Sequence, residues 1–336
     1  MELLYIIGNG FDIAQGCNTS YTEFYKYLDK KLSPRSRLLE LMLNDINFKK
    51  ELNWSDMELA LGEFCVNANS KEEFDEFYFY LADQLKEFLV EKENQFSISD
   101  ALMEKYASDL ITPDFYLTNR EKSACRGFFS NFTSQRNINV ITYNYTTILE
   151  KALQKIAGGN KTLPTLSYSY AFQKILKIHG SLTSPMLMGL DNIEQIQNKE
   201  FAADEDIIDY FVKPVSNYQL GTLVDDNAQT TIEQANLIVT MGVSFGETDK
   251  TWWKHIGDRL NTSSKVRVII YQYCPDIADN AYLKQRKKRE ITKLFLQKCG
   301  LTPEQIENCS TRVHVAINEA FLKPDDRVVG ISRRGY

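Results

Sequence analysis

The stretch of sequence that decides the fold is Leu3-Leu4-Tyr5-Ile6-Ile7-Gly8-Asn9-Gly10-Phe11-Asp12. Its first half is an unbroken apolar run, which predicts a short strand buried on both faces. The run leads into Gly8-Asn9-Gly10, residue types that allow a tight turn or a close approach of two backbones. A buried strand, a glycine turn and a helix present backbone N–H groups to a phosphate in doubly wound α/β folds. The dinucleotide-binding fingerprint is incomplete, since position 13 is Ile, and a turn without a ligand would need the same glycines.

Length and composition indicate an ordinary globular protein. The chain has 336 residues, of which 43% are hydrophobic and 25% charged, and its net charge of −6 argues against a surface built for nucleic acid. The six cysteines lie far apart, without a Cys-x-x-Cys pair or an adjacent histidine, which predicts free thiols and no metal site. No apolar run is long enough to cross a membrane and none resembles a signal peptide. We therefore expect a cytoplasmic protein with neither a membrane nor a nucleic-acid partner.

A long helical region interrupts the α/β pattern. Most of residues 33–136 has helical periodicity, and Ser70-Lys71-Glu72-Glu73 has the form of a capping box at a helix start. Apolar residues then recur at three- and four-residue spacing as far as Leu89, which predicts an amphipathic helix packed in a bundle. We predict an inserted α-helical subdomain at 33–136, a discontinuous Rossmann-like α/β domain over 1–32 and 137–322, and a polar C-terminal tail at 323–336.

Further buried strands are predicted in the second half of the chain. Apolar and β-branched runs occupy residues 138–143, 237–242, 266–271 and 313–316, and residues 174–180 show an alternation typical of a strand that reaches a site at its end. Strands that alternate with helices form a parallel sheet with helices on both faces. The predicted fold class is therefore α/β, a Rossmann-like parallel sheet with a large α-helical insertion. Residues 191–226 are polar and mixed in pattern, and we interpret them as a helix and loops that cover the site.

Polar residues follow four of the predicted strands at the point where each strand ends. The four segments are Gly8 to Asp12, Thr142-Tyr143-Asn144-Tyr145-Thr146, His179-Gly180, and Gly242-Val243-Ser244-Phe245-Gly246. In an open parallel sheet, ligands bind in the crevice outside the carboxyl ends of the strands. Because these ends carry Asn, His, Ser and Asp together, they predict a binding site.

Taken in order, these motifs resemble the AbiH family of bacterial phage-defence proteins, which act by abortive infection. The similarity rests on the segments Gly8 to Asp12, Thr142 to Glu150, Lys177 to Leu182 and Met241 to Asp249. It extends from residue 3 to about residue 256 and includes the helical motif Trp54-Ser55-Asp56-Met57-Glu58.

AbiH proteins are in turn similar to sirtuin-like domains, which hold NAD with a glycine-rich loop, a TxN motif and an HG motif. The resemblance thus implies a nucleotide ligand, with NAD as substrate or bound ligand, and no metal. This chain departs from sirtuins because it lacks their GAGxS loop and their zinc cysteines, and it has Asn144-Tyr145-Thr146 where they have Asn-Ile-Asp.

The candidate residues suit hydrolysis of the nicotinamide–ribose bond, a reaction in which positive charge develops on the sugar. The predicted catalytic residues are His179 as a general base or ribose ligand, Asn144 as a ligand of the ribose or the attacking water, and Asp12 as a stabiliser of the sugar charge. The predicted cofactor-binding residues are Gly8, Asn9, Gly10 and Phe11 in the first turn, where the two glycines would let backbone N–H groups approach the phosphates. They also include Gly242 in the turn after the strand at 237–242, and Ser244 and Asp249 on the adenosine side or its ribose.

Each candidate also has a purely structural interpretation. Asp12, Asn144 and Asp249 could each cap the helix that follows, and His179 could be a buried structural histidine. Glu58 could close over the crevice as a catalytic or ribose-binding carboxylate, or it could be a partly buried carboxylate paired inside the bundle.

Two functional hypotheses follow. In the first, an AbiH-like protein binds NAD and hydrolyses it during phage defence. In the second, a non-catalytic sensor binds a nucleotide or an ADP-ribose-like signal and transmits it to a partner through the helical insertion. A nuclease is a third hypothesis, which no metal-ligand cluster in the sequence favours. His255 and His314 are expected to be structural, and the basic run Lys284–Arg289 is expected to be a solvated helix face. A homo-oligomer is left open.

Overall fold

A mostly parallel sheet forms the centre of the computed structural model, which describes residues 1–31, 36–45, 54–97, 99–132, 135–156, 165–167, 170–278 and 280–324. The sheet has seven strands in the order β3-β4-β2-β1-β5-β6-β7. Neighbouring strands are parallel except for the edge pair β3 and β4, which is antiparallel. The strands are β1 (Glu2–Ile7), β2 (Arg136–Thr142), β3 (Thr165–Ser167), β4 (Tyr170–Lys177), β5 (Leu237–Met241), β6 (Arg267–Gln272) and β7 (Val313–Ile317).

Strand β1 is central in the sheet, between β2 and β5. Because successive side chains in a strand point to opposite faces, its apolar run divides into two sets. Leu3, Tyr5 and Ile7 join one hydrophobic cluster, whereas Leu4 and Ile6 join another. The prediction of a strand buried on both faces is confirmed.

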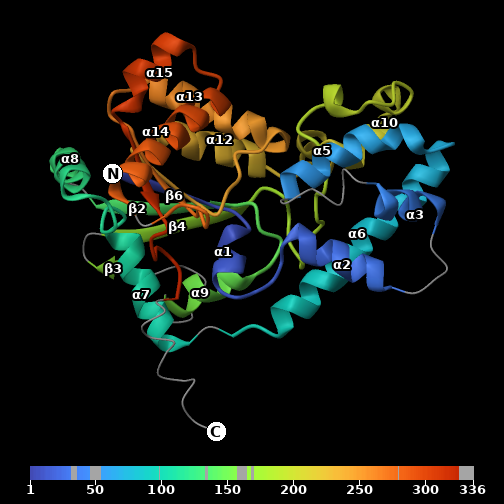
Figure 1. Cartoon of the computed structure of the whole chain (residues 1–336), viewed down its shortest axis with the longest axis horizontal. Coiled ribbons are helices and arrows are strands. Elements are labelled where there is room, and N and C mark those ends of the chain that lie inside the picture. Colours follow the sequence, from blue (N-terminus) through green and yellow to red (C-terminus); the bar gives the residue numbers. More distant parts are fainter. Residues whose placement is uncertain are drawn as a thin grey trace, which may run out of the picture.

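Helices cover both faces of the sheet (Figure 1). The cluster on the Tyr5 side includes residues of α1 (Gly10–Ala14), α7 (Asp100–Ile111), α8 (Asn119–Phe129) and α9 (Ile148–Ile156). The cluster on the Leu4 side includes residues of α12 (Val224–Gln234), α13 (Lys250–Thr262), α14 (Ala281–Lys298) and α15 (Pro303–Ser310). The predicted class, an α/β Rossmann-like parallel sheet with helices on both faces, is therefore confirmed.

The remaining helices form a second body beside the sheet, which we call the helical module (Figure 1). Phe74 lies at its centre, with ring centroids 5.2 Å from Phe201 and 5.4 Å from Phe211. Chain segments far apart in the sequence thus share one core. The module consists of α2 (Tyr21–Lys30), α3 (Arg37–Asn44), α5 (Trp54–Phe64), η1 (Cys65–Asn67), α6 (Lys71–Asn94), η2 (Ile193–Gln195), η3 (Phe201–Ala203), α10 (Glu205–Phe211) and α11 (Lys213–Gln219).

The packing of the module does not follow the predicted insertion limits of 33 and 136. Helix α2 lies before residue 33 and packs in the module, whereas α7 and α8 lie before residue 136 and pack against the sheet. Helical periodicity shows that a helix has a buried face, but not which body buries it. The last residues of the predicted tail, 325–336, lie outside the described residues.

Two further expectations from the sequence can be compared with the structure. The six cysteines are free and five of them are buried, as their spacing predicts. Among the helices that are described, none combines the length and the apolar character that a membrane span requires.

Candidate functional site

A cleft of about 890 Å³ lies at the carboxyl edge of the sheet. Gly8, Asn144, His179 and Gly242 all line it, so the structure brings the four predicted strand ends together. Its wall on the other side includes Glu58 and neighbouring residues of the helical module. The cleft therefore lies where the sheet meets the module, a common place for a ligand site in α/β proteins.

The glycines after β1 and β5 hold two backbone turns against each other. The amides of Gly8 and Gly10 donate to the carbonyl oxygens of Met241 and Gly242, each at 3.0 Å. A Cβ on Gly10 would lie 2.5 Å from the Cα of Gly242, which itself has a φ of +68°. The glycine pattern is thus explained by close packing, and these two amides are occupied rather than free for a phosphate.

The turn after β5 leaves backbone donors free instead. Among the described residues, the amides of Val243, Ser244 and Phe245 have no hydrogen-bond partner. Gly242 and Phe245 both have positive φ values, +68° and +54°, and Ser244 is exposed and lines the cleft. Consecutive free N–H groups in such a turn can bind an anion.

Asp12, Asn144 and Thr146 form one polar cluster in the cleft. Asn144 Nδ2 donates to Asp12 Oδ1 at 3.0 Å, and Thr146 Oγ1 donates to Asp12 Oδ2 at 2.6 Å. Burial outweighs these hydrogen bonds and raises the pKa of Asp12 to about 7. The Asn144 Oδ1 atom is buried without a partner among the described residues. Neither Asp12 nor Asn144 is a helix cap, since α1 begins after Asn9 and α9 begins at Ile148.

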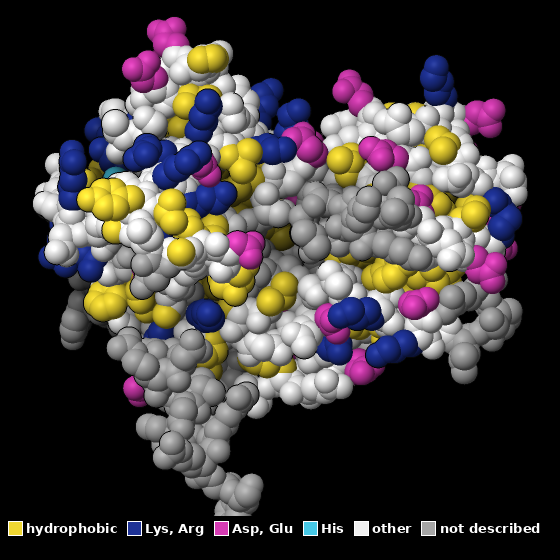
Figure 2. Space-filling view, in the orientation of Figure 1, with side chains coloured by type: hydrophobic (Ala, Val, Ile, Leu, Met, Phe, Trp, Pro, Cys, Tyr) yellow, Lys and Arg dark blue, Asp and Glu magenta, His cyan; other side chains and the backbone are white. Residues whose placement is uncertain are grey.

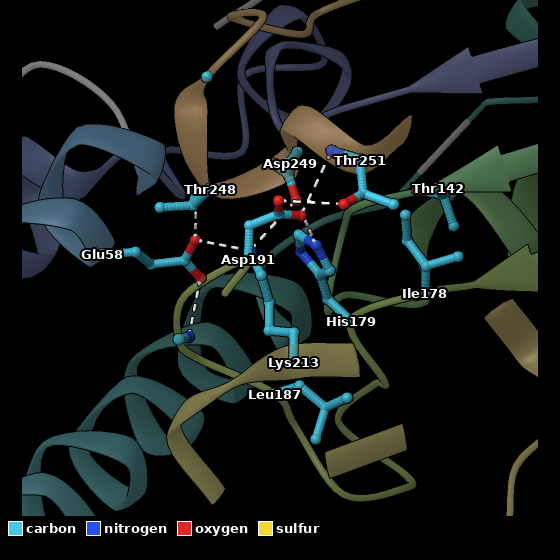
Figure 3. Close-up of polar contacts among 12 residues, drawn as sticks. Glu58, Thr142, Ile178, His179, Leu187, Asp191, Lys213, Thr248, Asp249 and Thr251 are labelled. Atoms are coloured by element: carbon cyan, nitrogen blue, oxygen red, sulfur yellow. Dashed lines mark hydrogen bonds and ion pairs between the residues drawn. The ribbon is translucent and has the colours of Figure 1, made fainter. Parts of the chain in front are cut away.

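His179 and Asp249 form a hydrogen-bonded pair at the other end of the site (Figure 3). His179 Nε2 lies 2.8 Å from Asp249 Oδ1, and Lys213 and His179 outweigh burial to hold the pKa of Asp249 below its usual range. An ionised carboxylate only accepts hydrogen bonds, so Nε2 carries the proton and Nδ1 is the unprotonated nitrogen of neutral His179. Within the described part of the chain, Nδ1 has no partner. His179 thus offers a base to the cleft that it lines.

Asp249 belongs to a larger buried network (Figure 3). Its Oδ1 lies 3.1 Å from Lys213 Nζ, which also lies 2.9 Å from Glu58 Oε2. Glu58 accepts from Thr248 Oγ1 at 3.0 Å and from the Gly189 amide at 3.3 Å. Burial opposes the charged form of Lys213, but the two carboxylates outweigh it and raise its pKa. Glu58 is therefore a buried carboxylate paired with Lys213, and it also lines the cleft.

Three predicted cofactor-binding residues make side-chain contacts within the protein. Phe11 is fully buried against Tyr106 in the core of the sheet and does not line the cleft. Asn9 lines the cleft, but its side chain binds the Thr19 carbonyl and hydroxyl groups. Asp249 lines the cleft and contacts His179, and its side chain makes no hydrogen bond as the cap of α13.

The sequence prediction missed Lys213, Thr248 and the packing of tyrosines on His179. Lys213 comes just before Pro214 in the segment without a clear pattern, so no sequence feature distinguishes it. Its position is fixed by the chain: Lys213 N donates to Leu190 O at 2.9 Å. The Tyr143 ring lies 5.1 Å from the His179 ring. Tyr143 directly precedes Asn144 in the sequence, and this place at the end of a predicted strand is the signal that points to it as a site residue.

Gly180 fixes the direction of the chain after His179. It has a φ of +72°, and a Cβ there would lie 1.7 Å from the Pro185 carbonyl oxygen. Only a glycine fits this turn, which explains the His-Gly pair in the sequence.

Features outside the cleft agree with their structural interpretation. His255 packs beside Trp252 on α13, and His314 is buried in β7 with a pKa lowered by burial. The basic run lies on α14, on the side of the molecule where Figure 2 shows lysines and arginines gathered, and none of its residues lines the cleft. No group of three or more metal-ligating side chains occurs among the described residues.

The chain was compared with known proteins. Residues 4–271 match the family described as bacteriophage abortive infection AbiH. The matched region includes the ends of β1, β2, β4 and β5 and therefore the residues around His179. A comparison with curated proteins finds no match. Because the family match covers well over half of the chain, this protein belongs to the AbiH family of bacteriophage abortive infection proteins.

Proposed function

We propose that this AbiH protein binds NAD in the cleft and hydrolyses its nicotinamide–ribose bond. The observation that carries the proposal is the His179 imidazole, whose Nε2 is held 2.8 Å from Asp249 while Nδ1 stays without a partner among the described residues. A base fixed in one tautomer by a buried carboxylate is the arrangement that general-base catalysis requires. The loss of NAD from an infected cell is a direct route to abortive infection.

The reaction needs one proton acceptor and a polar environment for a cationic sugar. The bond between C1′ and the nicotinamide nitrogen breaks, and its electron pair stays on nicotinamide. A water oxygen forms the new bond to C1′, and the proton released from that water passes to His179 Nδ1. The products are nicotinamide and ADP-ribose. His179 contributes about 10²- to 10⁴-fold to the rate if it acts as a general base.

Asn144 is proposed to orient the water or a ribose hydroxyl. Its Nδ2 donates to Asp12, which fixes the amide plane and leaves Oδ1 as a buried acceptor without a partner among the described residues. An unsatisfied buried acceptor favours a ligand hydroxyl or water at that point. Asp12 serves here by positioning Asn144, and its ionised form would also stabilise positive charge on the sugar.

The pyrophosphate is proposed to lie on the turn after β5. The amides of Val243, Ser244 and Phe245 have no partner among the described residues, whereas those of Gly8 and Gly10 are occupied. Free amides suit phosphate oxygens. A cleft of about 890 Å³ is also large enough for a dinucleotide.

Incubation of the purified protein with NAD tests the proposal directly. Chromatography should detect nicotinamide and ADP-ribose, and His179→Ala or Asn144→Ala should reduce their rate of formation by about a hundredfold or more. His255→Ala is the matched control because His255 lies on α13 and does not line the cleft. Absence of adenine-nucleotide binding by wild-type protein in calorimetry would refute the proposal.

A non-catalytic sensor is the second candidate function. It is favoured by the contact between Glu58 of the helical module and Lys213, which links the module to Asp249. Tight binding of NAD or ADP-ribose, with no turnover and no effect of His179→Ala on product formation, would support the sensor over the hydrolase.

A further inference from the structure

We infer that Lys213 is a positioning residue for His179, and that Glu58 and Lys213 together set the proton affinity of the imidazole through Asp249. The inference rests on the proposed role of His179 as a base. Lys213 Nζ and His179 Nε2 both contact the same atom, Asp249 Oδ1, at 3.1 and 2.8 Å (Figure 3). Lys213 therefore acts on the imidazole without contacting the substrate.

The four groups lie almost out of contact with water. Their exposed fractions are 3% for Glu58, 5% for His179, 5% for Lys213 and 9% for Asp249. Charges in such surroundings are weakly screened, and an unpaired one is costly. The sum of the charges in the network therefore has a strong influence on whether His179 accepts a proton.

The charges of the network balance when His179 is protonated. Glu58 and Asp249 carry two negative charges and Lys213 carries one positive charge, so the network has a net charge of −1 around a neutral imidazole. A proton on His179 brings the sum to zero. Loss of Lys213 would leave −2 and strengthen proton binding, whereas loss of the Glu58 charge would leave zero and weaken it. The observed set thus accommodates both the neutral and the protonated imidazole.

Other ionisable groups also face this network. Asp191 accepts from Thr251 Oγ1 at 3.0 Å, and Asp225, whose pKa is raised by burial to about 6, accepts from Asn217 Nδ2 at 2.9 Å. The rings of Tyr143 and Tyr145 lie 5.1 and 6.2 Å from the His179 ring. These groups stay the same in the variants proposed below, so they do not alter the expected differences.

The helical module supplies both residues of the ion pair between Lys213 and Glu58. Glu58 comes from α5, and Lys213 begins α11, where its backbone N–H donates a hydrogen bond to Leu190 O. The chain of contacts from Glu58 through Lys213 and Asp249 to His179 therefore forms only when the module is in its observed position beside the sheet.

Nuclear magnetic resonance of the histidine side chains tests this inference without any substrate. The chain has three histidines, so ¹⁵N-labelled imidazole signals can be assigned with His255→Gln and His314→Gln. In Lys213→Met, we expect the titration midpoint of His179 to rise by about one pH unit or more, and in Glu58→Gln we expect it to fall. The double variant Glu58→Gln/Lys213→Met keeps a net charge of −1 and should return the midpoint toward the wild-type value.

The matched control is Lys71→Met, which removes a lysine that pairs with Asp204 and Asp206 at the surface of the module. It should leave the midpoint unchanged. Equal midpoints in wild type and Lys213→Met, or shifts in the same direction for both single variants, would overturn the inference. The double variant is also expected to fold if removal of Lys213 alone does not, because it leaves one buried carboxylate instead of two.

Activity separates this inference from the proposed function. If the wild-type protein hydrolyses NAD, the acid limb of its pH–rate profile should move to higher pH in Lys213→Met, since His179 must be neutral to act as a base. If the wild-type protein does not hydrolyse NAD, the proposed function fails, whereas the titration still shows whether Lys213 and Glu58 control His179.

Discussion

The carboxyl group of Asp12 has lost nearly all contact with water, and two hydrogen bonds do not make up for that loss. Its pKa of about 7 lies above its usual value of 3.8. Between these two pH values, the folded protein keeps a proton on Asp12 that the unfolded chain has already released. The contribution of Asp12 to stability is therefore complete below about pH 4 and disappears as the pH rises to about 7.

Asp12→Asn should remove this pH dependence. Relative to the variant, the free energy of unfolding of the wild-type protein should fall by about 1.4 kcal/mol per pH unit between about pH 4.5 and 7 and then level off. Urea denaturation across this range measures the difference. Asp83→Asn, a change at an exposed position on α6, should give no such slope. A constant difference between wild type and Asp12→Asn would contradict the prediction.

Site residues could be predicted from the sequence where they follow a strand. Asn144, His179 and Gly242 each lie within two residues of the end of a strand, and the parallel sheet brings such positions together. Lys213 could not be predicted, because its place depends on the backbone contact with Leu190, far away in the sequence. Asp249 could be predicted as a site residue, but its partner depends on the side-chain network that only the structure shows.

At the scale of elements, the contact between the turns after β1 and β5 sets the floor of the cleft. Gly10→Ala would place a Cβ 2.5 Å from a backbone atom of Gly242, and a backbone cannot yield as a flexible side chain does. We expect a loss of about 1–3 kcal/mol in the free energy of unfolding.

Gly127→Ala is the control for this prediction. Gly127 lies in α8, and a Cβ added there would meet nothing within 4 Å, so the change should stabilise the protein by up to about 1 kcal/mol through helix propensity. Chemical denaturation of both variants provides the measurement. Similar effects of the two substitutions would show that the turns are not packed as described.

Strands such as β1, β5 and β6 could be predicted because each is a compact, largely apolar run, whereas the grouping of the helices could not. Phe74 lies on a helix with clear periodicity, but its partners Phe201 and Phe211 come from the segment whose pattern is mixed. The short elements η3, α10 and α11 in that segment are held by contacts with α6 and with one another, and such short helices leave little periodicity in a sequence.

At the scale of the whole molecule, the cleft has one wall from the sheet and another from the helical module. A ligand that contacts both walls should stabilise the folded protein. At a concentration about one hundred times its dissociation constant, the gain is about 2.7 kcal/mol, enough to raise the melting temperature by several degrees. In a thermal-shift measurement, ADP-ribose should raise the melting temperature of the wild-type protein, and NAD should raise that of His179→Ala.

Adenosine provides the comparison, because it lacks the pyrophosphate proposed to bind the turn after β5. Its effect on the melting temperature should be smaller than that of ADP-ribose at the same concentration. An equal effect of both compounds would argue against a phosphate site at Val243–Phe245.

The position of β1 in the sheet also bears on how the chain folds as it is synthesised. This strand is made before its neighbours β2 and β5, which begin only at residues 136 and 237. One edge of β1 must therefore stay unpaired until β2 is made, and the other until β5 is made, and such non-local pairing is slow. Helices α2, α3, α5 and α6 can form locally in the meantime. We expect production of the protein to depend on chaperones that shield this strand until β2 and β5 emerge from the ribosome.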